Sequence, residues 1–411
     1  MNNKNKLIPR VRFPEFQNSG EWISYYLKEI LKEFNEKVGK DNEENFTIVS
    51  VGELGFRFRS EVYKQGTILT KNIKDCKIFP YSSICFGLGS KNLAVDVNNV
   101  NESKFCVSPA YNIFKFDDSL LLPKFLRYLI FAKKNKWSSI LLIQSSRQGK
   151  NIDKKILFNL QIPLPSLAEQ QKIAACLSSL DEVITAEQKK LELLNAHKKG
   201  LLQNLFPQEG ETVPKLRFPE FQNSGEWELK RLGEVFKSFS GGTPDTSKKE
   251  YYSGQIPFIR SAEISKEKTE LYISELGLRN SSAKMVRKGD LLVALYGANS
   301  GDSAIAKIDG AINQAVLCLQ SEYSNEFIYH FLTLKKNQIV SKYIQGGQGN
   351  LSGEIIKSVA IPFPERKEQQ KIAACLSSLD DLIQAQQQRI YLLQQHKKGL
   401  LQNLFPILDA E

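Results

Sequence analysis

The chain has 411 residues, of which 41% are hydrophobic and 25% charged, and its net charge is +11. This composition excludes a disordered or collagen-like chain. No apolar run approaches the roughly 18 residues of a membrane-spanning helix, and the basic N-terminus leads into no apolar stretch, so we expect neither a membrane span nor a secretory signal. The basic excess favours an anionic partner, most often nucleic acid.

Cysteine and histidine usage argues against metal and disulfide chemistry. None of the six cysteines forms a C-x-x-C pair, and the chain has only three histidines. A structural zinc site or a disulfide framework is therefore not expected. Reduced thiols in a cytosol fit the pattern best, so we predict a cytoplasmic protein.

The chain is a tandem repeat of one plan. Three segments occur twice in the same order: RFPEFQNSGEW at 12–22 and 217–227, EQQKIAACLSSLD at 169–181 and 368–380, and HKKGLLQNLFP at 197–207 and 396–406. Chance does not produce three such identities in order. Between them lie two bodies of different sequence, which we name head one (23–162) and head two (228–361). Each head ends in an Ile-Pro-x-Pro motif.

The repeats divide the chain into seven predicted segments. They are a leading segment at 1–22, head one at 23–162, a central helix at 163–207, a linker with the repeated leading segment at 208–227, head two at 228–361, a distal helix at 362–406 and a tail at 407–411. Two nearly identical frames thus hold two divergent inserts. That arrangement suits a protein that recognises two different targets through one mechanism.

Head one is predicted to have an α+β (mixed α/β) fold with short strands. Ile78–Phe86 and Tyr111–Phe116 are candidate strands. Its loops contain side chains of the kinds that contact phosphates and base edges. The predicted DNA contacts of head one are Arg57, Arg59, Lys64, Lys91, Arg147, Gln148 and Lys150.

After Pro165 and again after Pro364, apolar residues alternate at spacings of four and three, as in the seam of a coiled coil. The predicted seam residues are Ile173, Leu177, Leu180, Ile184, Leu191 and Leu194 in the first helix and Ile372, Leu376, Leu379, Ile383, Ile390 and Leu393 in the second. Pro207 and Pro406 suit the helix ends. Gly200 and Gly399 are weak points at which we expect each helix to kink or end early.

Such a helix is too long for one small domain. About 40 residues at roughly 1.5 Å each span roughly 60 Å. The seam needs a partner: the other copy of the helix is favoured, and packing of each helix on its own head is the alternative. The pattern does not fix the direction, and we predict an antiparallel coiled coil that relates the heads by a pseudo-twofold axis.

Head two is predicted to be an α+β body as well. Asp290–Leu295 and Ala315–Leu319 resemble buried strands. Small, polar and basic loops lie between the strands. The predicted DNA contacts of head two are Thr243, Lys248, Lys249, Tyr251, Tyr252, Arg260, Ser261, Tyr296, Asn299, Ser300, Gln345, Gln348 and Asn350.

The positive charge is confined to the heads. Head one has 22 basic and 14 acidic side chains, a net +8, and head two has 17 and 14, a net +3. The rest of the chain is therefore neutral. Basic heads on a neutral frame are expected if the heads touch phosphates.

Catalytic motifs are missing from the chain. It has no Pro-Pro pair of the kind found in amino-methyltransferase motifs and no G-x-x-x-x-G-K-[ST] loop. Asp245, Glu263 and Lys266 have the residue types of a metal nuclease, but their spacing is loose. We therefore predict no catalytic, metal-binding or cofactor-binding residue in this chain.

These motifs resemble those of the specificity subunit, HsdS, of type I restriction-modification systems. The resemblance covers nearly the whole chain and rests on the repeated Phe-Pro-Glu-Phe…Gly-Glu-Trp, on Ile-Pro-x-Pro followed by Glu-Gln-Gln-Lys-Ile, and on the repeated helix. In head two, Gly241–Pro244, Ile256–Ile259 and Lys288–Asp290 also match the family pattern. Head one matches more loosely, because it has no Gly-Gly-Thr-Pro.

The resemblance implies a division of labour. Each head would be a target recognition domain that binds one half of a split double-stranded DNA site, and the helices would set the gap between the halves. Two modification subunits (HsdM) would dock on the helices and methylate adenine with S-adenosylmethionine. Restriction subunits (HsdR) would add translocation and cleavage with ATP and Mg²⁺. The location would be the bacterial cytosol.

Two other interpretations remain open. A self-sufficient DNA methyltransferase or nuclease with an unrecognised active site is the main alternative, and turnover by the purified chain alone would distinguish it. A scaffold that binds no DNA is the other, and steeply salt-dependent DNA binding would argue against it.

Overall fold

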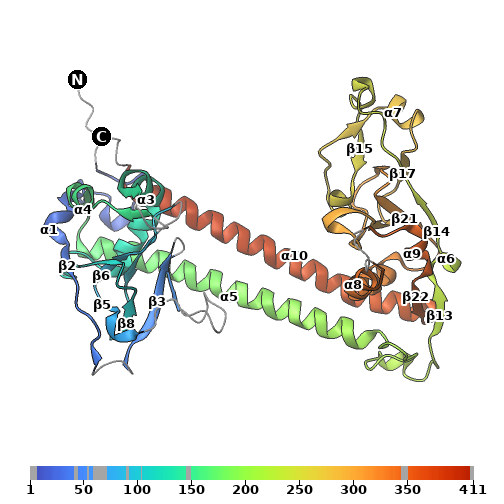
Figure 1. Cartoon of the computed structure of the whole chain (residues 1–411), viewed down its shortest axis with the longest axis horizontal. Helices are drawn as coiled ribbons and strands as arrows, with labels where there is room; N and C mark the ends of the chain where they lie inside the picture. The colour runs from blue at the N-terminus through green and yellow to red at the C-terminus, as the bar shows by residue number, and fades with distance from the viewer. Residues whose placement is uncertain are drawn as a thin grey trace. The chain divides into compact units, whose positions relative to one another are not determined.

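The computed structural model describes residues 7–40, 45–52, 55–58, 72–88, 92–102, 104–144, 150–343 and 350–407 (Figure 1). The chain forms two compact units. Unit one comprises Met1–Glu187 and Arg389–Glu411, and unit two comprises Gln188–Gln388. Each unit therefore contains one head together with a part of both long helices.

Head one contains two four-stranded sheets. The first has the strand order β2-β9-β6-β7, and the second has the order β4-β3-β8-β5. Their strands are β2 (Lys32–Phe34), β3 (Thr47–Gly52), β4 (Gly55–Phe58), β5 (Lys77–Phe79), β6 (Ser83–Phe86), β7 (Val95–Asn98), β8 (Phe105–Val107) and β9 (Asn112–Lys115). A short hairpin pairs β10 (Leu142–Gln144) with β11 (Lys150–Ile152).

Helices cover the first sheet of head one. The longest is α3 (Pro123–Leu141), which begins at a proline and packs on β7. Shorter ones are α1 (Leu27–Ile30) and α4 (Lys154–Asn159). Phe86, Phe114 and Phe125 are fully buried between these layers, in the largest hydrophobic cluster of unit one. Burial of such aromatic side chains contributes about 1.5–3 kcal/mol each.

Head two has the corresponding pair of sheets. Their orders are β14-β21-β18-β19 and β16-β15-β20-β17. The strands are β14 (Lys237–Ser240), β15 (Ile256–Ile259), β16 (Tyr272–Ile273), β17 (Lys284–Val286), β18 (Leu291–Ala294), β19 (Ser303–Ile305), β20 (Gly310–Ile312) and β21 (Val316–Gln320). The helices are α6 (Leu232–Val235), α7 (Glu275–Arg279), α8 (Asn325–Tyr343) and α9 (Gly353–Ser358). The chain also forms short 3-10 turns, among them η5 (Lys249–Tyr251), η6 (Ser261–Glu263) and η7 (Gly297–Asn299).

The two heads share one topology although their sequences share little. In chain order, each strand of head one from β2 to β9 has its counterpart in head two from β14 to β21. Each second sheet contains one parallel pair, β3 with β8 and β15 with β20. Because a shared strand order with a shared parallel pair is a long-range property, the sequence comparison did not reveal it.

A two-stranded sheet closes each head. In unit one β1 (Ile23–Tyr26) pairs with β12 (Gln161–Leu164), and in unit two β13 (Glu228–Arg231) pairs with β22 (Ala360–Phe363). Both pairs are antiparallel. The predicted head boundaries after residues 162 and 361 fall inside β12 and β22, so each of these strands belongs structurally to its head.

The two long helices are α5 (Leu167–Leu205) and α10 (Arg366–Asn403). Each begins two residues after the predicted proline, at Pro165 or Pro364. The expectation of an early end was wrong, since both helices continue through Gly200 and Gly399. One glycine costs a helix only about 1 kcal/mol, and the surrounding turns outweigh it.

Within each unit the two helices run antiparallel. In unit one, Asp181 pairs with Lys397 and Glu187 with Arg389. Residue numbers therefore increase along α5 in the direction in which they decrease along α10. In unit two, Lys198 pairs with Asp380, while Leu202 and Leu205 share a cluster with Ile372 and Leu376. All twelve predicted seam residues are buried or half-buried. The predicted α+β fold with paired long helices is confirmed.

The predicted strands are largely confirmed. Asp290–Leu295 contains β18 and Ala315–Leu319 contains most of β21. Tyr111–Phe116 contains β9. Ile78–Phe86 forms two strands, β5 and β6, because the chain turns at Pro80–Ser82, where Ser82 has a φ of 54°. Among the described residues, no helix is both long and apolar enough to cross a bilayer.

Candidate nucleic-acid interface

The repeated leading segments clamp each head to a long helix in the same way. Arg12 donates to Glu169 through Nε and Nη2, both at 2.7 Å. Arg217 donates to Glu368 in the same way, both at 2.8 Å. The glutamate side chains are 1% exposed. Hydrogen bonds to the glutamates raise the pKa of both arginines, while burial opposes this shift. Identical sequence thus gives an identical buried bidentate pair in each unit.

Aromatic rings surround these clamps. In unit one, Trp22 contacts Phe125 and Phe405, with ring centroids 5.9 and 6.3 Å apart. In unit two, Trp227 contacts Phe327 and Phe206 at 5.9 and 6.3 Å. In each unit, the tryptophan of the leading segment therefore packs in one cluster with an α-helix of the head (α3 or α8) and the end of a long helix. This packing anchors each head to the long helices of its unit.

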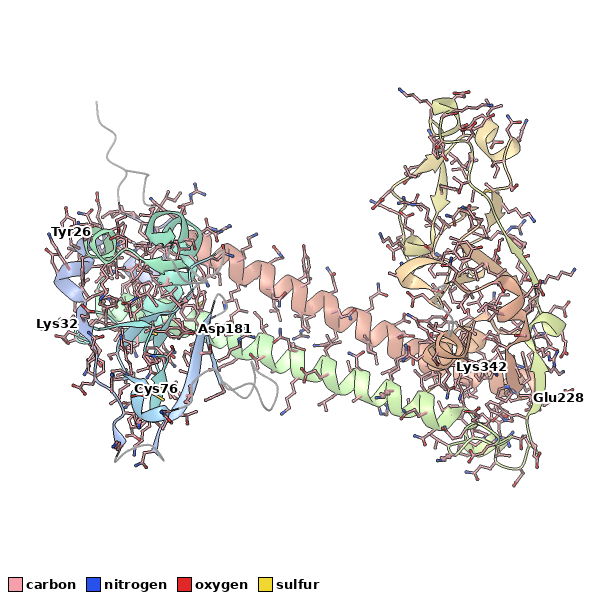
Figure 2. All side chains as sticks on the ribbon, viewed as in Figure 1. Tyr26, Lys32, Cys76, Asp181, Glu228 and Lys342 are labelled. Atoms are coloured by element: carbon pink, nitrogen blue, oxygen red, sulfur yellow. The ribbon has the colours of Figure 1, made fainter. Side chains whose placement is uncertain are left out.

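At one corresponding position, where each head packs on the long helices, the two units have different residues. In unit one, the Tyr128 hydroxyl donates to Asp181 at 2.8 Å. Figure 2 labels Asp181, which lies on α5. In unit two His330 takes this place, is fully buried, and its Nε2 lies 3.2 Å from Ser377 Oγ. Burial, followed by the nearby Lys198 ammonium, lowers the pKa of His330 to about 3. Although His330 Nδ1 lies 3.9 Å from Asp380, that carboxylate is held by Lys198, so the imidazole is neutral.

Head one presents Arg57 on an edge strand. Arg57 lies on β4, opposite Ser50 of β3, and is exposed. Lys150 opens β11, and its side chain is outside the described part of the structure. The remaining predicted contacts lie outside the described residues: Arg59, Lys64, Lys91, Arg147 and Gln148. Their contact with DNA stays a prediction.

Head two gathers several predicted residues around one loop. Lys248 lies over the Tyr251 ring at 5.1 Å and donates to its hydroxyl at 3.2 Å. The Tyr252 hydroxyl donates to Pro244 O at 2.7 Å. The exposed Thr243 donates to Gln314 Oε1 at 2.7 Å. Lys249 is exposed beside them. The loop and the neighbouring Gln314 therefore present two ammonium groups, a hydroxyl and an amide to solvent.

Two glycines allow this loop to approach the sheets. A Cβ added at Gly241 would lie 1.8 Å from Ile312 O, and one at Gly242 would lie 2.6 Å from the Ser282 Cβ. Any larger residue would push the loop away. The Gly-Gly pair therefore fixes the position of the Thr243–Tyr252 segment.

Other predicted contacts have internal partners. Tyr251 is 6% exposed and Ser300 is 7% exposed, and the Ser300 hydroxyl donates to Leu295 O. Arg260 is bound by Glu263 and Glu270. These side chains support the loops in this structure, so their contact with DNA remains a prediction. Tyr296 and Asn350 are exposed, while Gln345 and Gln348 lie outside the described residues.

Ser261 and Asn299 line a shared pocket in head two. Its volume is about 440 Å³, and α8 contributes Tyr329, Thr333 and Lys336 to its wall. Lys336 donates to Asp302 at 2.5 Å. Sequence reasoning missed the α8 residues because they are far from the loops along the chain. Their spacing of four and three, which places them on one helix face, was the available signal.

Asp245 and Glu263, which have the residue types of a metal nuclease, are each hydrogen-bonded to a residue nearby in the sequence. Asp245 accepts from Ser247 N at 3.0 Å, and Glu263 accepts from Arg260 Nε at 2.9 Å. Within the described ranges, no three His, Cys, Asp or Glu side chains are arranged to hold a metal ion. The six cysteines form no disulfide.

Comparison with known proteins identifies the repeated unit. Residues 19–196 and again 224–395 match the family model of the type I restriction modification DNA specificity domain. The putative type I restriction enzyme MjaX specificity subunit of Methanocaldococcus jannaschii is 29% identical over 291 residues, which cover 68% of this chain and 66% of that protein. The MjaVIII specificity subunit of the same organism is 26% identical over 293 residues, covering 67% and 68%.

Solved structures show the same fold at low identity. The S subunit of a type I restriction-modification system from M. genitalium covers 98% of this chain and 100% of its own, with a TM-score of 0.62 and 16% identity. A chain from a structure describing complex assembly of the type I R-M system covers 94% and 97%, with a TM-score of 0.55 and 18% identity.

Proposed function

The chain belongs to the family of type I restriction modification DNA specificity proteins, and from that premise we propose that each of its heads recognises one half of a two-part DNA sequence. As a specificity subunit it recognises DNA, and catalysis belongs to other subunits. The observation that carries the proposal is the pair of heads with one strand order and divergent loops, each on a nearly identical frame.

Electrostatics supports DNA as the ligand of the heads. The heads contain the whole positive excess of the chain, and in head two Lys248 and Lys249 stand on one exposed loop. Each phosphate contact releases condensed counterions, so binding should weaken steeply with salt. Hydroxyl and amide groups such as those of Thr243 and Gln314 are suited to base edges. Different loops on one scaffold would give different half-sites.

The long helices are suited to set the gap between the half-sites. With 39 and 38 residues, α5 and α10 are each roughly 60 Å long at roughly 1.5 Å per residue. A stiff, paired helix holds a constant length because each turn is hydrogen-bonded internally. The gap would therefore be a fixed number of base pairs.

The helices also provide docking positions for two copies of one partner. Val183 and Leu193 on α5, and Leu382 and Leu392 on α10, are equivalent in the repeat and are 40%, 63%, 57% and 56% exposed. Unit one contains Val183 and Leu392, and unit two contains the other two. Exposed apolar residues at repeated positions indicate protein interfaces. We assign them to two modification subunits.

The remaining parts of the proposal concern the partners. The modification subunits would bind S-adenosylmethionine, and restriction subunits would use ATP and Mg²⁺. We also propose a place in the cytosol, where the DNA lies.

Exchange of one head tests the proposed function. Residues 228–363 are replaced by a head of another family member, so that β13 and β22 travel together. The methylated sequences of a host that expresses the chain and its modification partner are then mapped. One half of the motif should change while the other half and the gap stay constant. A change in both halves, or in neither, would refute the modular model.

Docking has a separate test. Leu193→Glu and Leu392→Glu together should prevent copurification of the modification subunit, because a buried charge without a partner is costly. Lys189→Glu, at an exposed polar position of α5, is the matched control. Undiminished copurification with the double variant would place the partner elsewhere.

A further inference from the structure

The second sheet of head one ends in a hairpin whose backbone is held from one side by aromatic rings. β4 is the edge strand and pairs only with β3 among the described strands. Phe56 on β4 lies against Phe79 and Phe105, with ring centroids 6.2 and 5.6 Å apart. The following residue, Arg57, is exposed. The ring contacts fix how deep the strand lies, and its pairing with β3 sets the register within the hairpin.

A buried carboxylate ties this hairpin to the first sheet of head one. Asp96 of β7 is 1% exposed, and its Oδ2 accepts the Phe56 backbone N–H at 2.9 Å. Its Oδ1 accepts from Val97 N and from Arg127 Nε of α3, both at 2.8 Å. A buried carboxylate is strongly unfavourable unless it is paired and hydrogen-bonded, so the arginine is needed to keep the anion there.

The backbone at the start of β4 is shaped for this contact. Gly55 has a φ of +92°, in the region that favours glycine. A Cβ at Gly55 would lie 2.5 Å from Asp96 Oδ2. The carboxylate therefore lies directly against the main chain at the first residue of β4.

Head two reaches the same result with residues at other positions. The segment between β15 and β16 contains Glu263, which is 2% exposed. Its Oε2 accepts from Arg260 Nε at 2.9 Å, and its Oε1 accepts the Glu270 backbone N–H at 2.8 Å, two residues before β16 begins. Between these fixed points the segment exposes Lys266 and Lys268.

The two arginine–carboxylate pairs are not copies of each other. At the strand and helix positions that correspond to Asp96 and Arg127, head two has Ala304 on β19 and Tyr329 on α8. Tyr329 there lines the open pocket rather than holding a carboxylate. The pairs therefore belong to the divergent heads and not to the repeated frame. What the heads have in common is a buried carboxylate that accepts a backbone N–H on, or two residues before, the second strand of the outer hairpin, which is β3–β4 in head one and β15–β16 in head two.

We propose that Asp96–Arg127 in head one and Glu263–Arg260 in head two are positioning pairs for DNA recognition. Each fixes the outer hairpin of its head, so that Arg57 in head one, and Lys266 and Lys268 in head two, meet the DNA in a constant register. The inference rests on the proposed function, because it assigns these hairpins to the DNA-facing surface.

The test uses each head as the control for the other. Asp96→Asn and Glu263→Gln keep the side-chain size but remove the charge that holds the arginine. The full-length chain with its modification partner selects DNA from a random duplex library, and base preference is scored for each half-site. Loss of one charge-assisted hydrogen bond predicts that discrimination falls about tenfold at one half-site. Asp96→Asn and Glu263→Gln should affect different half-sites.

Further variants separate positioning from general destabilisation. Lys154→Ala in head one and Lys357→Ala in head two remove exposed ion pairs, to Glu33 and Glu354, and should leave both half-sites unchanged. If a carboxylate variant unfolds, Arg127→Lys and Arg260→Lys keep the charge and remove only the paired geometry. These variants should show the same half-site-specific loss.

The outcomes are distinguishable. If the unmodified chain selects no two-part sequence, the proposed function itself fails. If it selects one, but folded variants keep both preferences or lose both equally, the positioning inference is overturned and the proposed function stands.

Discussion

At the scale of single residues, the repeated arginine–glutamate clamps are the most buried ion pairs in the described part of the frame. Arg12 and Arg217 are only 7% and 8% exposed, and their glutamate partners 1%. A bidentate pair in such surroundings is stable only while both members are present, because either one alone is a buried, unpaired charge. The same sequence also contains an exposed pair next to each clamp, Lys172–Glu15 and Lys371–Glu220.

Removal of one clamp should therefore destabilise its unit strongly. Arg217→Met leaves Glu368 buried without its partner and should lower the free energy of unfolding by about 3–5 kcal/mol. Lys371→Met breaks an exposed ion pair and a cation–π contact with Phe218, and should cost only about 1 kcal/mol. Urea unfolding followed by tryptophan fluorescence compares the two. Equal shifts of the urea midpoint would show that the buried clamp stabilises the unit no more than the exposed pair does.

His330 should make the stability of unit two depend on pH. Its pKa is about 3 in the folded chain and 6.5 as a free side chain, so between these values the unfolded state binds a proton that the folded state does not. Stability is lost as the pH falls below 6.5, with a slope approaching about 1.4 kcal/mol per pH unit.

The measurement is the thermal midpoint at pH 7 and pH 5. His330→Gln should reduce the difference between the two midpoints, and His197→Gln, at an exposed position of α5, serves as the control. An unchanged difference in His330→Gln would show that other groups cause the acid sensitivity.

At this scale, the sequence predicts where residues of a given chemical type cluster, but not which of their side chains become buried or paired. Sequence reasoning found the Lys248–Tyr252 loop, because basic and aromatic residues cluster there along the chain. It did not find that Tyr251 is buried or that Arg260 is bound by two carboxylates, since both facts depend on residues that only folding brings near. It missed Asp96 and Arg127 altogether, because a single aspartate in a strand has no distinguishing local pattern.

At the scale of elements, the long helices follow from a local rule. Their seam repeats every three to four residues, so a short window contains the whole signal. Charged residues on each long helix pair with the other helix: Lys198 with Asp380, Lys397 with Asp181 and Glu187 with Arg389. Each such pair fixes the register of the antiparallel packing.

The helix glycines offer a direct test of how much the tertiary packing outweighs local propensity. A Cβ at Gly200 or Gly399 would meet nothing within 4 Å. Gly200→Ala and Gly399→Ala should each raise the free energy of unfolding by about 0.5–1 kcal/mol. Gly210→Ala is the contrasting control, because its φ of +84° is strained for alanine and should lower stability. Urea midpoints measure all three, and destabilisation by the helix variants would show a packing role for the glycines.

At the scale of the whole molecule, the proposed spacer function depends on helix length. A heptad inserted after Lys190 in α5 and after Arg389 in α10 preserves the seam. It adds about 10 Å of helix at roughly 1.5 Å per residue, or about three base pairs at roughly 3.4 Å each. Methylated-site mapping should show both half-sites unchanged and a longer gap. A constant gap would reject the helices as the spacer.

The sequence by itself determined the repeat, the two neutral helical frames with basic heads, and the seam of the helices. All of these are properties of residues near one another in the chain or of a repeated segment, so they survive without coordinates. The family resemblance rests on the same segments, and the match at 19–196 and 224–395 confirms it.

Only the tertiary structure decided that the divergent heads share one strand order and that each fixes its outer hairpin with a different buried pair. Strand pairing joins residues far apart, such as Ile48 with Cys106, and Asp96 meets Arg127 across two elements. A buried carboxylate is stable only where packing excludes water and supplies its donors together. That condition is a property of the assembled core, and no single stretch of sequence contains it.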